Sequence, residues 1–283
     1  MKKLTAILAI SLVSFNLQAS TWGTWNGKTV GTASGNASSL NGKTIGTASG
    51  NIGSFNGMTS PASGASYTGQ TCAGGQSASN VSTQACSAQI TLSTNDYIFL
   101  YSTNGDNVAL SSCTTGTGTA TITWTVVASF HLWDATNGQG IDACVGNVTS
   151  GGTATPTANW GSNTGFTGVI AAAFSGTQRT SDGSTSHQNT GSSSTNGNTS
   201  GNITTTTNGD LLTGGLVDTA GSAATVTAGT TSVTFTKIAC SALSTANLCI
   251  EWGSQTTAGA GTGANWTLSN TDRTVAGIVT SKI

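Results

Sequence analysis

The sequence ANWGSNT at residues 158–164 returns near the C-terminus as ANWTLSNT at residues 264–271. Each copy is followed by a short apolar segment, at residues 166–174 and 275–280. Repetition of a motif together with its following strand is typical of a duplicated scaffold. We therefore interpret each copy as the closing strands of one half of an all-β body, in which the Asn satisfies a turn and the Trp fills a core.

Other segments also have the patterns of strands. Residues 97–101 (YIFLY) form a continuous apolar run, which fits a central strand buried on both faces. Residues 119–126 alternate Thr with apolar side chains, which predicts a strand buried on one face. In residues 166–174, one face is expected to carry apolar side chains from Phe166 to Phe174. Short strands separated by turn signals predict a β-sandwich or jelly roll with two pseudo-repeated halves.

The chain is expected to divide into four parts. Residues 176–202 contain no large apolar side chain, which predicts a long polar surface loop or a linker between the halves. Pro61 and the small residues after it predict a linker. The predicted parts are a signal peptide at 1–19, repeats at 20–60, a linker with the first disulfide at 61–88, and the sandwich body at 89–283, with halves at about 89–176 and 203–283 and the polar loop at 177–202.

The first residues have the pattern of a secretory leader. Lys2 and Lys3 precede an apolar run, and Leu17-Gln18-Ala19 ends in a small residue suited to cleavage. An uncleaved anchor is the alternative. No later run approaches the ~20 apolar residues of a membrane-spanning helix. We expect a secreted or cell-surface protein without a membrane span, and the periplasm is a second possible location.

Charged residues make up only 6% of the 283-residue chain, against about a quarter in ordinary soluble domains. Its polar surface must therefore consist of Ser, Thr, Asn and Gly, which favour strands and turns over helices. Without Lys2 and Lys3, six basic and nine acidic residues give a net charge of −3. The absence of a Lys/Arg cluster argues against nucleic acid as a partner.

Residues 20–60 contain a 15-residue repeat built on Asn-Gly. WNGKTVGTASGN at 25–36 is followed by LNGKTIGTASGN at 40–51 and by the shortened FNGMT at 55–59. Asn-Gly is a tight-turn signal, because both residues tolerate positive φ. The repeats have too few apolar residues for a core of their own. They predict either a short stacked stalk or a string of loose turns.

Six cysteines in an exported chain predict disulfides. Six cysteines allow 15 pairings, and the local solution is Cys72–Cys86, Cys113–Cys144 and Cys240–Cys249. The last pair fits a hairpin loop of eight residues. A zinc site is the alternative, but there is no Cys-x-x-Cys spacing and both histidines stand apart from the cysteines.

The last 35 residues resemble the closing pattern of uncharacterised secreted or phage-associated β-sandwich proteins. The matching segments are IEW at 250–252, QTTAG at 255–259, WTLS at 266–269 and the final apolar strand. The Asn-Gly repeats are similar to segments that begin such proteins and tail-fibre-like proteins. The resemblance implies an extracellular or virion-surface role, and its motifs are structural rather than catalytic.

Candidate catalytic residues are sparse. There is no Gly-x-Ser-x-Gly elbow, and His131 and Asp134 are expected on opposite faces of a strand. A jelly-roll glycosidase needs two carboxylates, for which Glu251 is one candidate without an evident partner. We therefore expect no enzymatic activity.

Aromatic residues are the better binding candidates, because an exposed ring beside Asn or Asp suits a sugar. The candidate ligand-binding residues are Trp133, Asp134 and Asn137, with Glu251 and Trp252 as a second set. A calcium ion is a further alternative, held by Asn104, Asp106 and Asn107 or by Asn208 and Asp210. Each of these sets can also be a turn that binds no ion. No other cofactor is predicted.

The sequence thus predicts a secreted, non-enzymatic surface, structural or adhesion protein. Its expected partners are further copies of itself, in an oligomer or fibre, or cell-surface glycans. A carbohydrate-binding module is the alternative function, and a glycoside hydrolase is the third.

Overall fold

The computed structural model divides the chain into two compact units, residues 1–63 and 64–283. The described residues contain strands and turns and no helix, so they hold no helix that could span a membrane. The structure describes residues 24–25, 28–29, 39–40, 43–44, 65–75, 80–128, 130–136, 138–177, 180–193, 198–218, 226–228, 232–242, 246–269 and 272–282.

The first unit is described by two short hairpins. β1 (Thr24–Trp25) pairs with β2 (Lys28–Thr29), and β3 (Ser39–Leu40) pairs with β4 (Lys43–Thr44). The register is the same in both, since Trp25 faces Lys28 and Leu40 faces Lys43. The strands flank the Asn-Gly pairs of the repeat. The rest of the predicted stalk lies outside the described residues.

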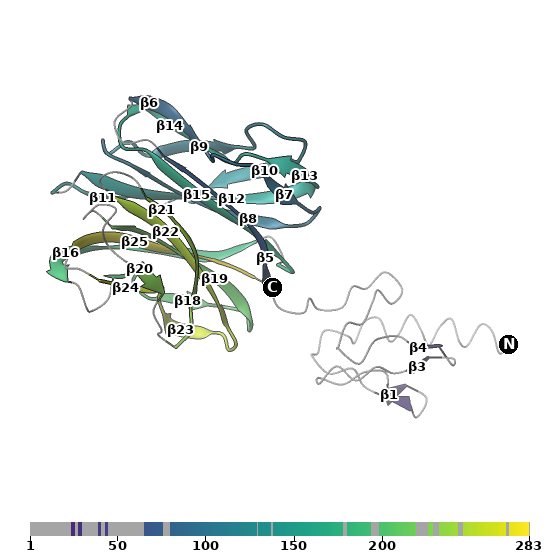
Figure 1. The fold of residues 1–283 in the computed structure, drawn as a ribbon. Helices are drawn as coiled ribbons and strands as arrows, with labels where there is room; N and C mark the ends of the chain where they lie inside the picture. The colour runs from purple at the N-terminus through teal and green to yellow at the C-terminus, as the bar shows by residue number, and fades with distance from the viewer. Residues whose placement is uncertain are drawn as a thin grey trace. The chain divides into compact units, whose positions relative to one another are not determined.

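Two large antiparallel sheets form the centre of the second unit (Figure 1). Sheet 1 contains six strands and sheet 2 contains five. In sheet 1 the order is β10 (Thr121–Val126), β12 (Gln139–Ser150), β8 (Tyr97–Asn104), β15 (Gly168–Ser175) and β5 (Ser66–Gly75), with β11 (Leu132–Asp134) beside β12. In sheet 2 the order is β21 (Thr236–Ala242), β22 (Asn247–Gln255), β19 (Asp210–Asp218), β25 (Asp272–Ser281) and β16 (Ser181–Ser193).

Each large sheet has its own smaller outer layer. Sheet 1 has β6 (Val81–Ala85), β14 (Thr157–Thr164) and β9 (Leu110–Thr114), and the pair β7 (Ile90–Leu92) and β13 (Gly152–Ala154). Sheet 2 has β17 (Asn198–Thr199), β24 (Asn265–Leu268) and β20 (Val226–Ala228), and the pair β18 (Ile203–Thr205) and β23 (Gly259–Thr262). The unit is therefore two sandwiches joined through their large sheets.

The two sandwiches have the same topology. Apart from β11, strands β5 to β15 occur in the same chain order and with the same neighbours as β16 to β25. This confirms the predicted all-β sandwich with two pseudo-repeated halves. The repeated motif places Trp160 in β14 and Trp266 in β24, at equivalent positions, and both indoles are buried. Both tryptophans are therefore structural, as the duplication predicted.

Strand positions differ from the predicted division at two places. β5 and β6 lie in residues 61–88, which were predicted to be a linker, and β16 and β17 lie in residues 177–202, which were predicted to be a loop. β5 and β16 are the equivalent edge strands of the two large sheets. Backbone pairing holds an edge strand, so it needs few large apolar side chains. For this reason the hydrophobic pattern of the sequence did not predict β5 and β16 as strands.

The three predicted disulfides are confirmed. Cys72–Cys86 joins β5 to the end of β6, and Cys113–Cys144 joins the outer strand β9 to β12 of sheet 1. Cys240–Cys249 links directly opposite residues of the β21–β22 hairpin. The described part of the chain holds no free cysteine. Two of the bridges therefore fasten outer strands of the first half to its large sheet.

The central core lies between the two large sheets. Tyr101 of β8 and Phe130 project from sheet 1 toward glycines of sheet 2. A Cβ atom on Gly215 would lie 2.4 Å from the Tyr101 ring, and one on Gly277 would lie 2.0 Å from the Phe130 ring. The Tyr101 hydroxyl donates a hydrogen bond to the Thr213 carbonyl oxygen. The rings therefore occupy the space that side chains at these glycines would fill.

We predict that Gly277→Ala lowers the free energy of unfolding by about 1–3 kcal/mol, because a methyl group there must displace a packed aromatic ring. Gly161→Ala is the matched control: it also lies in a strand, and its added Cβ would have no atom within 4 Å. Urea unfolding of both variants measures the difference. Equal effects of the two substitutions would contradict the close approach at Gly277.

Candidate functional site

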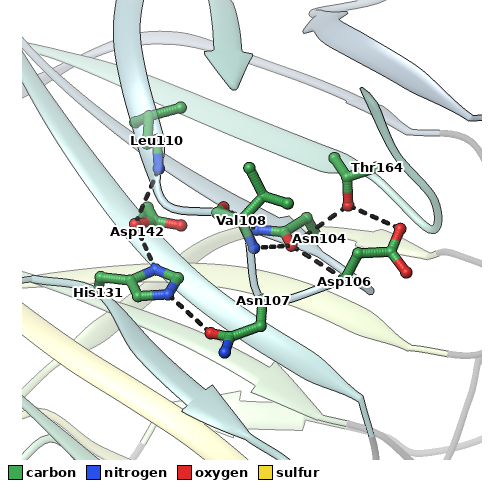
Figure 2. Close-up of polar contacts among 8 residues, drawn as sticks. All are labelled: Asn104, Asp106, Asn107, Val108, Leu110, His131, Asp142 and Thr164. Atoms are coloured by element: carbon green, nitrogen blue, oxygen red, sulfur yellow. Dashed lines mark hydrogen bonds and ion pairs between the residues drawn. The ribbon is translucent and has the colours of Figure 1, made fainter. Parts of the chain in front are cut away.

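Three connections meet at one end of sheet 1, and we call them the three-loop end. They are residues 105–109 between β8 and β9, residues 165–167 between β14 and β15, and residues 127–128, 130–136 and 138 around β11. Figure 2 shows polar contacts of the first connection with His131, Asp142 and Thr164. No equivalent of β11 occurs among the described strands of the second half. The end is therefore a place where the duplicated halves differ.

Asn104, the last residue of β8, organises the first connection. Its Oδ1 accepts hydrogen bonds from the backbone N–H groups of Asp106 and Val108, both at 3.2 Å, and from Thr164 Oγ1 at 3.3 Å. Its Nδ2 donates to the Val108 carbonyl oxygen at 2.9 Å. Asn side chains favour such turns because they replace backbone partners. Asn104 is fully buried, so it fixes the loop rather than contacting a ligand.

Asp106 ties the first connection to the second. Its Oδ2 accepts hydrogen bonds from Thr164 Oγ1, at 3.1 Å, and from the Gly165 N–H. The Gly105 N–H donates to the Gly165 carbonyl oxygen at 2.8 Å. Two loops that are about 60 residues apart in sequence are thus held side by side.

His131 ties the first connection to the third. Its Nδ1 lies 2.8 Å from Asp142 Oδ1, and its Nε2 lies 3.1 Å from Asn107 Oδ1 (Figure 2). The Leu110 N–H also donates to Asp142 Oδ1, at 3.3 Å. Because both ring nitrogens face oxygen acceptors, the imidazolium form suits the site best. The hydrogen bond to Asp142 raises the pKa of His131, against the opposing effect of burial.

This arrangement links two connections of the fold. His131 Nδ1 is bonded to Asp142, and Nε2 faces the amide oxygen of Asn107, which carries no proton for His131 to take. The sequence correctly suggested that His131 and Asp134 do not act together. The real partner, Asp142, lies opposite His131 across the β11–β12 hairpin, since Leu132 pairs with Ile141. Only the hairpin register could have revealed it.

Phe166 is an exposed aromatic residue at this end of sheet 1. It was expected to start the buried face of the strand at 166–174, but β15 begins at Gly168 and Phe166 lies in the preceding turn. Its φ is +49° and it is 37% exposed. Asn107, in the adjoining loop, has φ +53°. Positive φ is unusual for a bulky aromatic residue and costs free energy.

Of the predicted binding residues, Trp133 alone keeps a partly exposed side chain at this end. It is half-buried in β11, and its ring lies over Gly140 of β12. Asp134 is fully buried and forms two hydrogen bonds with Arg273 of the second half, at 2.7 and 2.8 Å. Its carboxylate therefore joins the halves. Asn137 lies outside the described residues.

Glu251 and Trp252 do not share a surface. Neighbouring residues of β22 point to opposite faces of sheet 2. The Trp252 ring packs against Phe174 in the central core, with ring centroids 5.8 Å apart. Glu251 points to the outer layer, where its Oε1 accepts a hydrogen bond from the Asn265 N–H at 3.1 Å. Burial raises the pKa of Glu251 to about 9, so the carboxyl is neutral at pH 7.

In both calcium alternatives, several side-chain oxygens accept hydrogen bonds within the protein, as Asn104 Oδ1 and Asp106 Oδ2 do in the first set. Asn208 Oδ1 accepts a hydrogen bond from the Ala258 N–H at 2.7 Å. Asp210 is paired with Asp182 instead, where burial and the neighbouring carboxyl raise the pKa of Asp210 to about 6. The Asp182 pKa falls to about 2, because its hydrogen bonds outweigh the effect of burial. In the described residues, no group of three or more His, Cys, Asp or Glu side chains is arranged to hold a metal ion.

Comparison of the chain with protein-family models, with curated proteins and with solved structures found no match.

We predict that Glu251→Gln stabilises the protein at neutral pH by an amount on the order of 3 kcal/mol. The pKa of Glu251 is raised on folding, so its favourable contribution is fully present below the unfolded value and is lost as pH rises toward about 9. Gln keeps the shape and cannot ionise. Thermal unfolding should show a gain in Tm at pH 7–8 that disappears at pH 4. A gain of the same size at both pH values would contradict a buried neutral carboxyl.

Proposed function

We propose that this protein is a non-enzymatic, extracellular surface protein that associates with copies of itself through the open edge of β16. The observation that carries the proposal is the edge itself. β16 is 13 residues long, and among the described strands its sheet neighbour is β25 alone. Its other side therefore presents backbone N–H and C=O groups that another strand can pair with.

The sequence of β16 lacks the features that usually protect such an edge. SDGSTSHQNTGSS contains no Lys, no Arg and no Pro, and Asp182 is its single acidic residue. Irregular pairing with β25 is confined to the two ends, between Ser181 and Gly183 and between Asn189 and Ser193. The middle of the strand is regular. With 6% charged residues in the whole chain, repulsion between copies is weak.

Three further features support an extracellular, non-enzymatic role. Three disulfides favour an oxidising compartment, in agreement with the leader that the sequence predicts. The partly buried His131 and the buried Glu251 have the chemistry of acids and bases, and both form hydrogen bonds within the fold. The repeats of the first unit add turns that can stack with those of a neighbouring copy. These features fit a subunit of an oligomer or fibre.

The test uses proline scanning of the regular part of β16. In a strand, consecutive residues direct their N–H groups to alternate sides. Of Thr185→Pro and Ser186→Pro, one therefore removes an N–H that bonds β25 and the other removes an N–H of the open edge. We predict that the variant without the open-edge N–H keeps the wild-type Tm and is monomeric by light scattering. The wild-type full chain is expected to form dimers or larger species.

Two outcomes would overturn this proposal. The first is a wild-type protein that stays monomeric at high concentration by light scattering and in negative-stain images. The second is an assembly that persists unchanged in the proline variant with the wild-type Tm. Thermal unfolding of both variants identifies which of them retains the fold.

A further inference from the structure

We propose that the three-loop end of the first half binds a neutral saccharide, with the Phe166 ring as its stacking platform. This site lies on loops and not on the β16 edge, so it is independent of the self-association proposed above. The inference rests on the placement of one exposed aromatic ring beside polar groups that the fold holds in position.

Among the residues whose side-chain exposure the structure describes, Phe166 is the one exposed large hydrophobic side chain. Its ring packs along Gly105, since a Cβ atom there would lie 2.9 Å from Phe166 Cδ2. The backbone keeps positive φ at this bulky residue, a conformation that Gly adopts without strain. The exposed position of the ring is therefore associated with an unfavourable backbone conformation at Phe166. Apolar faces of sugar rings pack on such a platform.

Polar side chains of the first connection lie beside the turn that carries Phe166, since Asp106 Oδ2 accepts a hydrogen bond from the Gly165 N–H. Asp106, next to Gly105, is exposed, and the loop holds its Oδ2, which leaves Oδ1 to accept a bond from a ligand hydroxyl. Asn107 is exposed as well, and its Oδ1 is oriented by His131, so its Nδ2 is directed away from the imidazole and can donate. A sugar hydroxyl both donates and accepts. The exposed carboxylate of Asp106 disfavours an anionic ligand, and the amide of Asn107 next to it suits a neutral polar one.

Trp133 extends the site on the side of the third connection. Residues two apart in a strand share a face, so Trp133 lies on the same face as His131. The turn that follows β11 approaches the first connection, because a Cβ atom on Gly138 would lie 3.8 Å from the Gly105 carbonyl oxygen. The half-buried Trp133 indole of the third connection offers a second aromatic surface to a sugar that spans both connections.

A polar cleft at the β7–β8 turn is the competing location. It has a volume of about 600 Å³ and includes Thr91, Ser93 and Asp96 in its wall. No aromatic side chain lines it. It can form hydrogen bonds to a ligand, but it offers no ring for stacking, and the three-loop end offers both.

The experiment screens the full chain on an array of immobilised neutral oligosaccharides built from hexoses and N-acetylhexosamines, with sialylated and sulfated glycans on the same array. The dissociation constant for the strongest neutral glycan is then measured by calorimetry. We expect Phe166→Tyr to bind within threefold of the wild type. Phe166→Leu and Phe166→Gly should lose at least tenfold in affinity, because neither offers a ring.

Phe166→Gly also separates binding from folding. Gly relieves the positive φ, so this variant should keep or raise the wild-type Tm while binding is lost. The matched control is Thr91→Ala with Ser93→Ala in the cleft, which should bind like the wild type. The proposal is overturned if no neutral glycan binds, if only ionic glycans bind, if Phe166→Leu binds like the wild type, or if the cleft variant alone loses binding.

Discussion

The packing of two aromatic rings into a glycine-lined surface holds the second unit together. Tyr101 and Phe130 of the first half fill the space above Gly215 and Gly277 of the second, and the Tyr101 hydroxyl reaches the backbone of β19. The large sheets can approach this closely only because those two strands lack side chains there. The Asp134–Arg273 ion pair adds a polar connection between the same halves. The two sandwiches therefore share a central core between their large sheets, in addition to the apolar clusters that each has beneath its outer layer.

The contact between the halves resembles a symmetric dimer within one chain. β5 of the first half lies against β21 of the second. β16, the counterpart of β5, lies against β11, which pairs with β12 on the same side as β10, the counterpart of β21. An exchange of equivalent edges is what a two-fold axis produces. Duplication followed by fusion of a self-associating sandwich would give this arrangement. The halves differ at the three-loop end, where the first half has β11 and the described strands of the second half include no equivalent.

The sequence predicts the class of the fold and its covalent frame well. Alternating Thr and apolar residues, the repeated Ala-Asn-Trp motif and the local spacing of cysteines each correspond to an element of the structure. Strands that depend on backbone pairing were missed. β16 has no large apolar residue, so its sequence has the composition of a loop. Its position becomes evident only from the partner strand β25.

The candidate site was harder to predict, because its residues meet through pairing between distant strands. Asp106 and Gly165 lie on different loops, and the partner of His131 is fixed by hairpin register rather than by nearest spacing. Phe166 matches the alternation of the strand after it, yet a turn displays it at the surface. Asp134 and Trp252 were predicted to bind a ligand. In the structure, Asp134 forms hydrogen bonds with Arg273 of the other half, and Trp252 packs against Phe174 of the other half.

The central claim is that the two sandwiches form one cooperative body. Differential scanning calorimetry tests it most directly, by comparing the calorimetric enthalpy with the van't Hoff enthalpy. The shared core predicts a single transition with a ratio of the two enthalpies close to one. Two resolved transitions, each with about half of the total enthalpy, would show that the halves unfold separately and would contradict this account.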